Sequence, residues 1–354
     1  MGRRTILSSL LVVSLASGLA MRVEAAEPPA VTYYTDTGSE VATITGDVLS
    51  TYGAFQFTSL DGTLFAGSRH TRRSEAVIAF DASTGERLFR VRDAFAPVVL
   101  AHGRKVGFMP DRFGHRDPYF SSVWIRNSTG RARQVVRFAG PGRTVNPRDF
   151  EGEGIPLDQA WDAAGRTLAV TFGNDVDLFI YDVWVVDVRA GEATRVSRGH
   201  RSRFPSLSPN GDRLALVREV SVCGDSDLRR AGDLAVMNAD GTDRVVLLEG
   251  SCDLYYTDPR WISEDELVAV RIEQVAFDVF ENDLVRIDAT TGDVTELVAT
   301  GDISFLSVSA ELQKIAYHRS TDTTGFRVYD LATATSTEFA TGVIPNLVGT
   351  HRLV

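Results

Sequence analysis

Residues 204–216 read Phe204-Pro205-Ser206-Leu207-Ser208-Pro209-Asn210-Gly211-Asp212-Arg213-Leu214-Ala215-Leu216. A tight turn at Asn210-Gly211 leads into an apolar strand with a small residue, Ala215, four positions after the glycine. Asn-Gly is typical of hairpin turns, because both residues tolerate a positive φ. The pattern recurs at Gly62–Ala66, Gly103–Gly107 and Gly165–Ala169, in degenerate form at Asp265–Ala269 and Leu312–Ala316, and weakly at Gly349–Leu353.

A second pattern follows each of the first six copies. It is a strand of alternating apolar and polar residues that ends in Asp or Asn, then a polar turn and another alternating strand. Its copies are Val77–Asp81, Val123–Asn127, Val183–Asp187, Leu234–Asn238, Leu284–Asp288 and Phe326–Asp330. Alternation indicates strands with one buried face. Four short strands repeating at roughly 40–60 residues predict the blades of a β-propeller.

The 204–216 repeat resembles the TolB-type (WD40-like, PD40) propeller repeat, whose core reads approximately P-x-W-S-P-D-G-x-x-I-A-F. Weaker copies are Pro259–Asp265 and Gln159–Gly165. The resemblance implies an all-β, seven-bladed β-propeller of four-stranded antiparallel blades, and it implies no particular activity. The chain has no room for the α/β domain that precedes the blades of TolB, so the role of TolB is not carried over.

The two chain ends complete the blade count. Ile344–Val354 is expected to supply two strands of a last blade, and Tyr33–Thr45 a second pair. Joining the N- and C-terminal strands would close the ring and remove two exposed sheet edges. The prediction is one propeller domain over residues 26–354.

Residues 1–25 are predicted to be a signal peptide. Arg3 and Arg4 precede an apolar run, Ile6–Ala20, and Val23-Glu24-Ala25 offers a cleavage site. Sec export and twin-arginine export both stay open. We expect a periplasmic or extracellular monomer without a membrane span. The net charge of −10 argues against nucleic acid as a partner.

The two cysteines, Cys223 and Cys252, are predicted to form a disulfide. They fall in loops on the same side of neighbouring blades, and export would supply an oxidising compartment. The alternative is two free thiols that happen to lie near each other.

The long connections all fall at one end of the strands, on the face that carries the b–c and d–a loops. They are 110–121, 138–157, 172–181, 218–232 and 272–282. Such connections often carry function, and the alternative is neutral insertion. Candidate binding residues on this face are Arg69, His70, Asp111, His115, His200, Arg218, Arg271, His318 and Arg319.

Arg69, Arg218 and Arg319 each follow the small residue by three positions, so they could ring the channel mouth and bind carboxylate or phosphate. The alternative is pairing with nearby acids. The histidines show no tight metal-ligand spacing, and His102 falls near an a–b turn on the other face. We therefore expect no metal, no cofactor and no catalytic residue.

The favoured hypothesis is an exported propeller scaffold that binds a protein or peptide partner on its long-loop face without catalysis. The alternative is a secreted propeller enzyme (lyase, lactonase or hydrolase) with a polar site at the channel mouth. The sequence contains no G-x-S-x-G nucleophile motif, no P-loop and no dinucleotide fingerprint. An enzyme would need several His, Asp or Glu side chains converging in a pocket.

Overall fold

The computed structural model describes residues 29–353. It leaves out 36–37, 44, 46–47, 53–54, 56, 71–74, 111–121, 128–129, 140–149, 152–154, 174–180, 198–200, 224–229, 277–278, 322–324, 340–342 and 348–351. The predicted signal peptide lies outside the described residues. Within them the regular structure is β-strand, and no helix there is long and apolar enough to cross a membrane.

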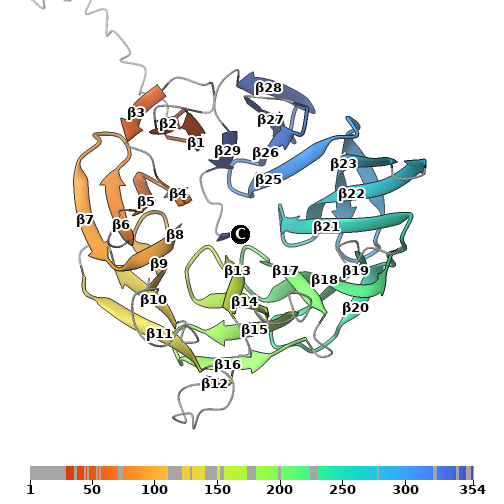
Figure 1. Cartoon of the computed structure of the whole chain (residues 1–354), viewed down its shortest axis with the longest axis horizontal. Coiled ribbons are helices and arrows are strands. Elements are labelled where there is room, and N and C mark those ends of the chain that lie inside the picture. Colours follow the sequence, from red (N-terminus) through yellow and green to blue (C-terminus); the bar gives the residue numbers. More distant parts are fainter. Residues whose placement is uncertain are drawn as a thin grey trace, which may run out of the picture.

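Seven antiparallel sheets form a ring, which confirms the predicted seven-bladed propeller (Figure 1). Blade 1 contains β4 (Phe57–Asp61), β5 (Leu64–His70), β6 (Glu75–Asp81) and β7 (Arg87–Arg92). Blade 2 contains β8 (Ala94–Leu100), β9 (Lys105–Pro110), β10 (Ser122–Asn127) and β11 (Ala132–Ala139), with β12 (Phe150–Glu151) added in parallel. Blade 3 contains β13 (Ile155–Trp161), β14 (Thr167–Gly173), β15 (Tyr181–Asp187) and β16 (Glu192–Arg195).

The following three blades have the same order from the inner to the outer strand. Blade 4 contains β17 (Ser202–Leu207), β18 (Arg213–Val222), β19 (Arg230–Asn238) and β20 (Val245–Leu248). Blade 5 contains β21 (Leu254–Trp261), β22 (Glu266–Ala276), β23 (Val279–Asp288) and β24 (Val294–Val298). Blade 6 contains β25 (Ile303–Ser309), β26 (Lys314–Arg319), β27 (Phe326–Asp330) and β28 (Thr335–Phe339).

Blade 7 joins the two ends of the chain, but not as two pairs of strands. Its order is β29 (Val343–Leu347), β1 (Val31–Thr35), β2 (Gly38–Ala42) and β3 (Val48–Tyr52). The N-terminal segment supplies three strands, so only the inner position is left for the C-terminal segment. The last strand, β30 (Arg352–Leu353), pairs instead with β13 of blade 3, near the centre of the ring (Figure 1).

The hydrophobic core is divided among the spaces between neighbouring blades. One cluster, for example, joins Ala215 and Leu234 of blade 4 to Trp261 and Leu267 of blade 5. The small residue of the repeat has a packing reason. A Cβ on Gly107 would lie 2.8 Å from Cζ2 of Trp161 in the next blade, so a bulky inner-strand side chain needs a small neighbour.

The Asp that ends the third strand of a blade caps the following turn. Oδ1 of Asp81 accepts hydrogen bonds from the backbone N–H groups of Ser83 and Thr84. The same arrangement recurs at Asp187, Asp288 and Asp330. At Asp81, Asp288 and Asp330 hydrogen bonds to the carboxylate lower the pKa. The Asp-then-turn pattern of the sequence is therefore a local side-chain cap.

Candidate functional site

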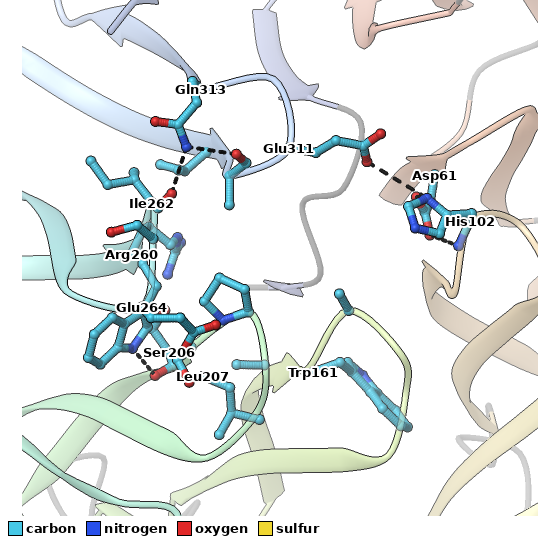
Figure 2. Close-up of a pocket in the computed structure, with 18 residues that line it drawn as sticks. Asp61, His102, Trp161, Ser206, Leu207, Arg260, Ile262, Glu264, Glu311 and Gln313 are labelled. Atoms are coloured by element: carbon cyan, nitrogen blue, oxygen red, sulfur yellow. Dashed lines mark hydrogen bonds and ion pairs between the residues drawn. The ribbon is translucent and has the colours of Figure 1, made fainter.

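A pocket of about 610 Å³ lies at the mouth of the ring (Figure 2). Its lining comes from the hairpins between the first and second strands of blades 1 to 6, which we call the a–b mouth. Blade 7 has no such hairpin, because β29 and β1 belong to opposite ends of the chain. In antiparallel blades these hairpins lie at the opposite end from the b–c and d–a loops. The pocket therefore lies on the face opposite to the long-loop face that was predicted to bind a partner.

The walls of the pocket are largely apolar. Trp161, Leu207, Trp261, Ile262 and Val308 border it, and all five are buried residues. The indole N–H of Trp161 donates to Oε1 of Gln159 at 3.1 Å, and that of Trp261 donates to the carbonyl of Ser206 at 2.9 Å. These bonds hold both ring systems in place, since a buried indole N–H needs an acceptor.

Arg260 is the buried cation of this pocket. The residue is 7% exposed, and its Nη2 lies 2.8 Å from Oδ1 of Asp258. Its Nε and Nη1 are buried and form no hydrogen bond within the described part of the chain. A β-bulge between Thr257 and Arg260, with Asp258 at φ +57°, precedes the side chain, and the first strands of blades 2 and 4 have the same kind of bulge.

The position of Arg260 is unusual within the repeat. It lies two residues before the residue that opens the a–b turn, Ile262. The corresponding positions of blades 1, 2, 3, 4 and 6 are Ser59, Val98, Ala160, Ser206 and Ser307. These are small, uncharged and buried. The other blades fold with small, uncharged residues at this position, so the fold does not require the charge of Arg260. A charged residue at such a position suggests that it binds a ligand.

Asp61, His102 and Glu311 meet at one edge of the pocket (Figure 2). Nδ1 of His102 lies 3.8 Å from Oδ1 of Asp61 and 3.8 Å from Oε2 of Glu311. The Asp61 side chain is only 2% exposed, whereas those of His102 and Glu311 are 68% and 55% exposed. The three residues come from the a–b hairpins of blades 1, 2 and 6, and no pattern in the sequence links them.

The predicted binding residues fall into three groups. Asp111, His115 and His200 lie outside the described residues, as does the side chain of His70 at the end of β5. Arg69 and Arg218 are exposed on the second strands of blades 1 and 4. Their binding role, and that of the other candidates, stays a prediction.

The remaining arginine candidates, Arg271 and Arg319, pair with acids, which for Arg319 was the alternative interpretation. Nη2 of Arg271 lies 2.9 Å from Asp283 and 2.8 Å from Glu296. Burial alone would lower the pKa of Arg271, but the two carboxylates outweigh it and raise the pKa. Nε of Arg319 donates to Asp302 at 2.8 Å. Nδ1 of His318 lies 3.1 Å from the hydroxyl of Ser304.

The predicted disulfide is confirmed. Cys223 and Cys252 are bonded, with their Cα atoms 5.4 Å apart. Cys223 follows the second strand of blade 4, and Cys252 precedes the first strand of blade 5.

No protein-family model matches the sequence, and no curated protein sequence matches it. Among solved structures, a tricorn protease matches with a TM-score of 0.65 and 12% identity, over 91% of this chain and 34% of that one. This chain thus spans about a third of the protease. An oligogalacturonate lyase in complex with manganese matches with a TM-score of 0.61 and 14% identity, over 89% of this chain and 85% of the lyase.

An acylaminoacyl peptidase from Pyrococcus horikoshii matches with a TM-score of 0.59 and 13% identity, over 81% of this chain and 46% of the peptidase. At this level of identity the likeness concerns the fold, because propellers support many unrelated activities. The TolB-type resemblance of the repeat stays a prediction from the sequence.

Proposed function

We propose that this protein is an exported propeller that binds a peptide or protein segment at its a–b mouth, with Arg260 holding a carboxylate of the ligand. The unpartnered Nε and Nη1 of Arg260 carry this proposal. A buried donor without an acceptor is costly, and a ligand oxygen would remove that cost.

The surroundings of Arg260 suit a peptide end. A pocket of about 610 Å³ is within the usual range for ligand sites. Trp261, Ile262 and Val308 offer an apolar surface to a side chain, while the guanidinium would take the terminal carboxylate. The disulfide supports export, because such bonds persist mainly outside the cytoplasm. The long-loop face remains an alternative place for the partner.

The proposal is tested by calorimetric titration of the mature protein with hydrophobic tripeptides that have a free or an amidated C-terminus. We expect binding of the free form only. Arg260→Lys should weaken binding about tenfold or more, because lysine keeps the charge but loses the fixed guanidinium donors. Arg166→Lys is the control, since Arg166 lies on the same face, pairs with Asp162 and does not line the pocket.

Equal binding of the two peptide forms, or no effect of Arg260→Lys, would contradict the proposal. Binding of galacturonate oligomers in place of peptides would reassign the ligand class. The enzyme hypothesis stays as the second candidate for one reason: Asp61, His102 and Glu311 converge in the same pocket, which is the arrangement an active site requires.

A further inference from the structure

The cluster of Asp61, His102 and Glu311 offers three donor atoms of types that bind metals. One ligand atom from each residue lies within 4.8 Å of the other two. Donors that bind a common ion at about 2.0–2.3 Å lie roughly 3–4 Å apart. The three donor atoms need to move only slightly closer together to bind one ion. The side chains of His102 and Glu311 are exposed, so packing against neighbours does not prevent this movement.

A hydrogen bond fixes the position of the Asp61 side chain in the cluster. Its Oδ2 accepts a hydrogen bond from the backbone N–H of His102 at 2.6 Å, so the carboxylate and the histidine backbone are held together. Oδ1 is left on the side of the imidazole, 3.8 Å from Nδ1. This distance is too long for a hydrogen bond.

Charge in the pocket favours a cation. The carboxylates of Asp61, Glu264 and Glu311 all line it. Among the lining residues that the structure describes, the arginine is Arg260, and it already pairs with Asp258, which does not line the pocket. The described lining of the pocket therefore carries more negative than positive charge, which a bound cation would offset.

We propose that Asp61, His102 and Glu311 form a binding site for one divalent transition-metal ion at the rim of the a–b mouth. One imidazole nitrogen with two carboxylates favours Mn²⁺ or Zn²⁺ over Mg²⁺ and Ca²⁺, which prefer oxygen ligands alone. Three protein ligands leave coordination positions for water or a bound ligand. This site is independent of the role proposed for Arg260.

The absence of an a–b hairpin in blade 7 explains how the three residues meet. Blades 6 and 1 flank blade 7 in the ring. Glu311, from the hairpin of blade 6, comes within 3.8 Å of His102 from blade 2. A seventh hairpin would occupy the intervening position at the rim.

The test is Mn²⁺ titration of the chelator-treated mature protein, with free Mn²⁺ measured by electron paramagnetic resonance and no peptide present. We expect one Mn²⁺ per chain, displaced by Zn²⁺. Glu311→Gln and His102→Asn should each weaken binding about tenfold or more, since loss of even an outer-shell partner costs ~10–100-fold. Asn suits position 102 because it tolerates the φ of +52° found there.

Glu264→Gln is the matched control, because Glu264 lines the same pocket from the a–b turn of blade 5. It should weaken Mn²⁺ binding far less than Glu311→Gln does, because it removes a charge from the pocket but no ligand. Near-ultraviolet circular dichroism verifies that each variant is folded. Equal losses in Glu264→Gln and Glu311→Gln would overturn the proposed site, as would Mn²⁺ binding that is indifferent to His102→Asn. Because no peptide is present, failure here leaves the proposed peptide binding untouched.

Discussion

The carboxylate of Asp61 in blade 1 accepts a 2.6 Å hydrogen bond from the backbone N–H of His102 in blade 2. Ala101, His102 and Gly103 all have positive φ, at 56°, 52° and 77°. Successive left-handed residues are unfavourable for side chains other than glycine. The buried Asp61 therefore stabilises a strained turn of the neighbouring blade.

Replacement of Asp61 should destabilise the protein even when no metal is present. We expect Asp61→Ala to lower the free energy of unfolding by about 2 kcal/mol, because it removes a charged, buried acceptor. Asp61→Asn should cost less, since its amide oxygen can still accept. The measurement is urea denaturation in the presence of a chelator. Asp265→Asn is the control, because that exposed side chain lies on the same face. Equal stability of Asp61→Ala and Asp265→Asn would contradict the capping role.

Closure of the ring depends on β29 and not on β30. Leu347 is fully buried in a cluster with Val31, Tyr33 and Phe326. Its backbone N–H donates to the hydroxyl of Ser307 at 3.0 Å. Deletion of residues 343–354 would remove this strand and expose the edge of β1. We expect a large fall in melting temperature, whereas deletion of 352–354 alone should have a minor effect. Equal melting temperatures of the two truncated chains would refute this difference.

Much of the fold could be predicted from the sequence because the repeat has local physical causes. Position 107 requires glycine because a Cβ there would collide with the ring of Trp161. Asp81 caps the turn that directly follows it in the chain. Strand β3 was missed, since its Val48 is half exposed, although the Thr45-Gly46-Asp47-Val48 sequence before it matches Thr291-Gly292-Asp293-Val294 of blade 5. An outer strand with weak burial leaves little pattern. Missing it led to the wrong division of strands in blade 7.

The candidate site was harder to predict. Asp61, His102 and Glu311 each occupy turn positions in different blades. Their meeting depends on ring closure, which no local pattern encodes. Arg260 did leave a signal, because it is charged where the repeat otherwise has small or apolar residues. Alignment of the blades by that position would have singled it out.

The ion pair between Asp302 and Arg319 should make stability depend on pH. Burial of Asp302 opposes ionisation, but hydrogen bonds from Arg319 and Thr321 outweigh it and lower the pKa from 3.8 to about 2. A depressed pKa stabilises the folded state above the unfolded value, and this contribution is lost as the pH falls from about 4 to 2. Asp302→Asn should cost about 1–2 kcal/mol at pH 7 and almost nothing near pH 2. Urea denaturation at both pH values measures the difference. A cost independent of pH would contradict the assignment.

The disulfide should contribute substantially to stability. It closes a loop with a sequence separation of 29 residues, for which the chain-entropy model gives about 3–4 kcal/mol. It also joins blade 4 to the connection that enters blade 5.

We expect the double variant Cys223→Ser/Cys252→Ser to unfold at lower urea concentration than the wild type. Reductant should lower the midpoint of the wild type to that of the variant and leave the variant unchanged, which separates loss of the bond from loss of side-chain packing. Cys223 is buried, so thiols must be titrated under denaturing conditions. Two reactive thiols per unreduced chain, or equal midpoints without reductant, would show that the bond does not stabilise the protein.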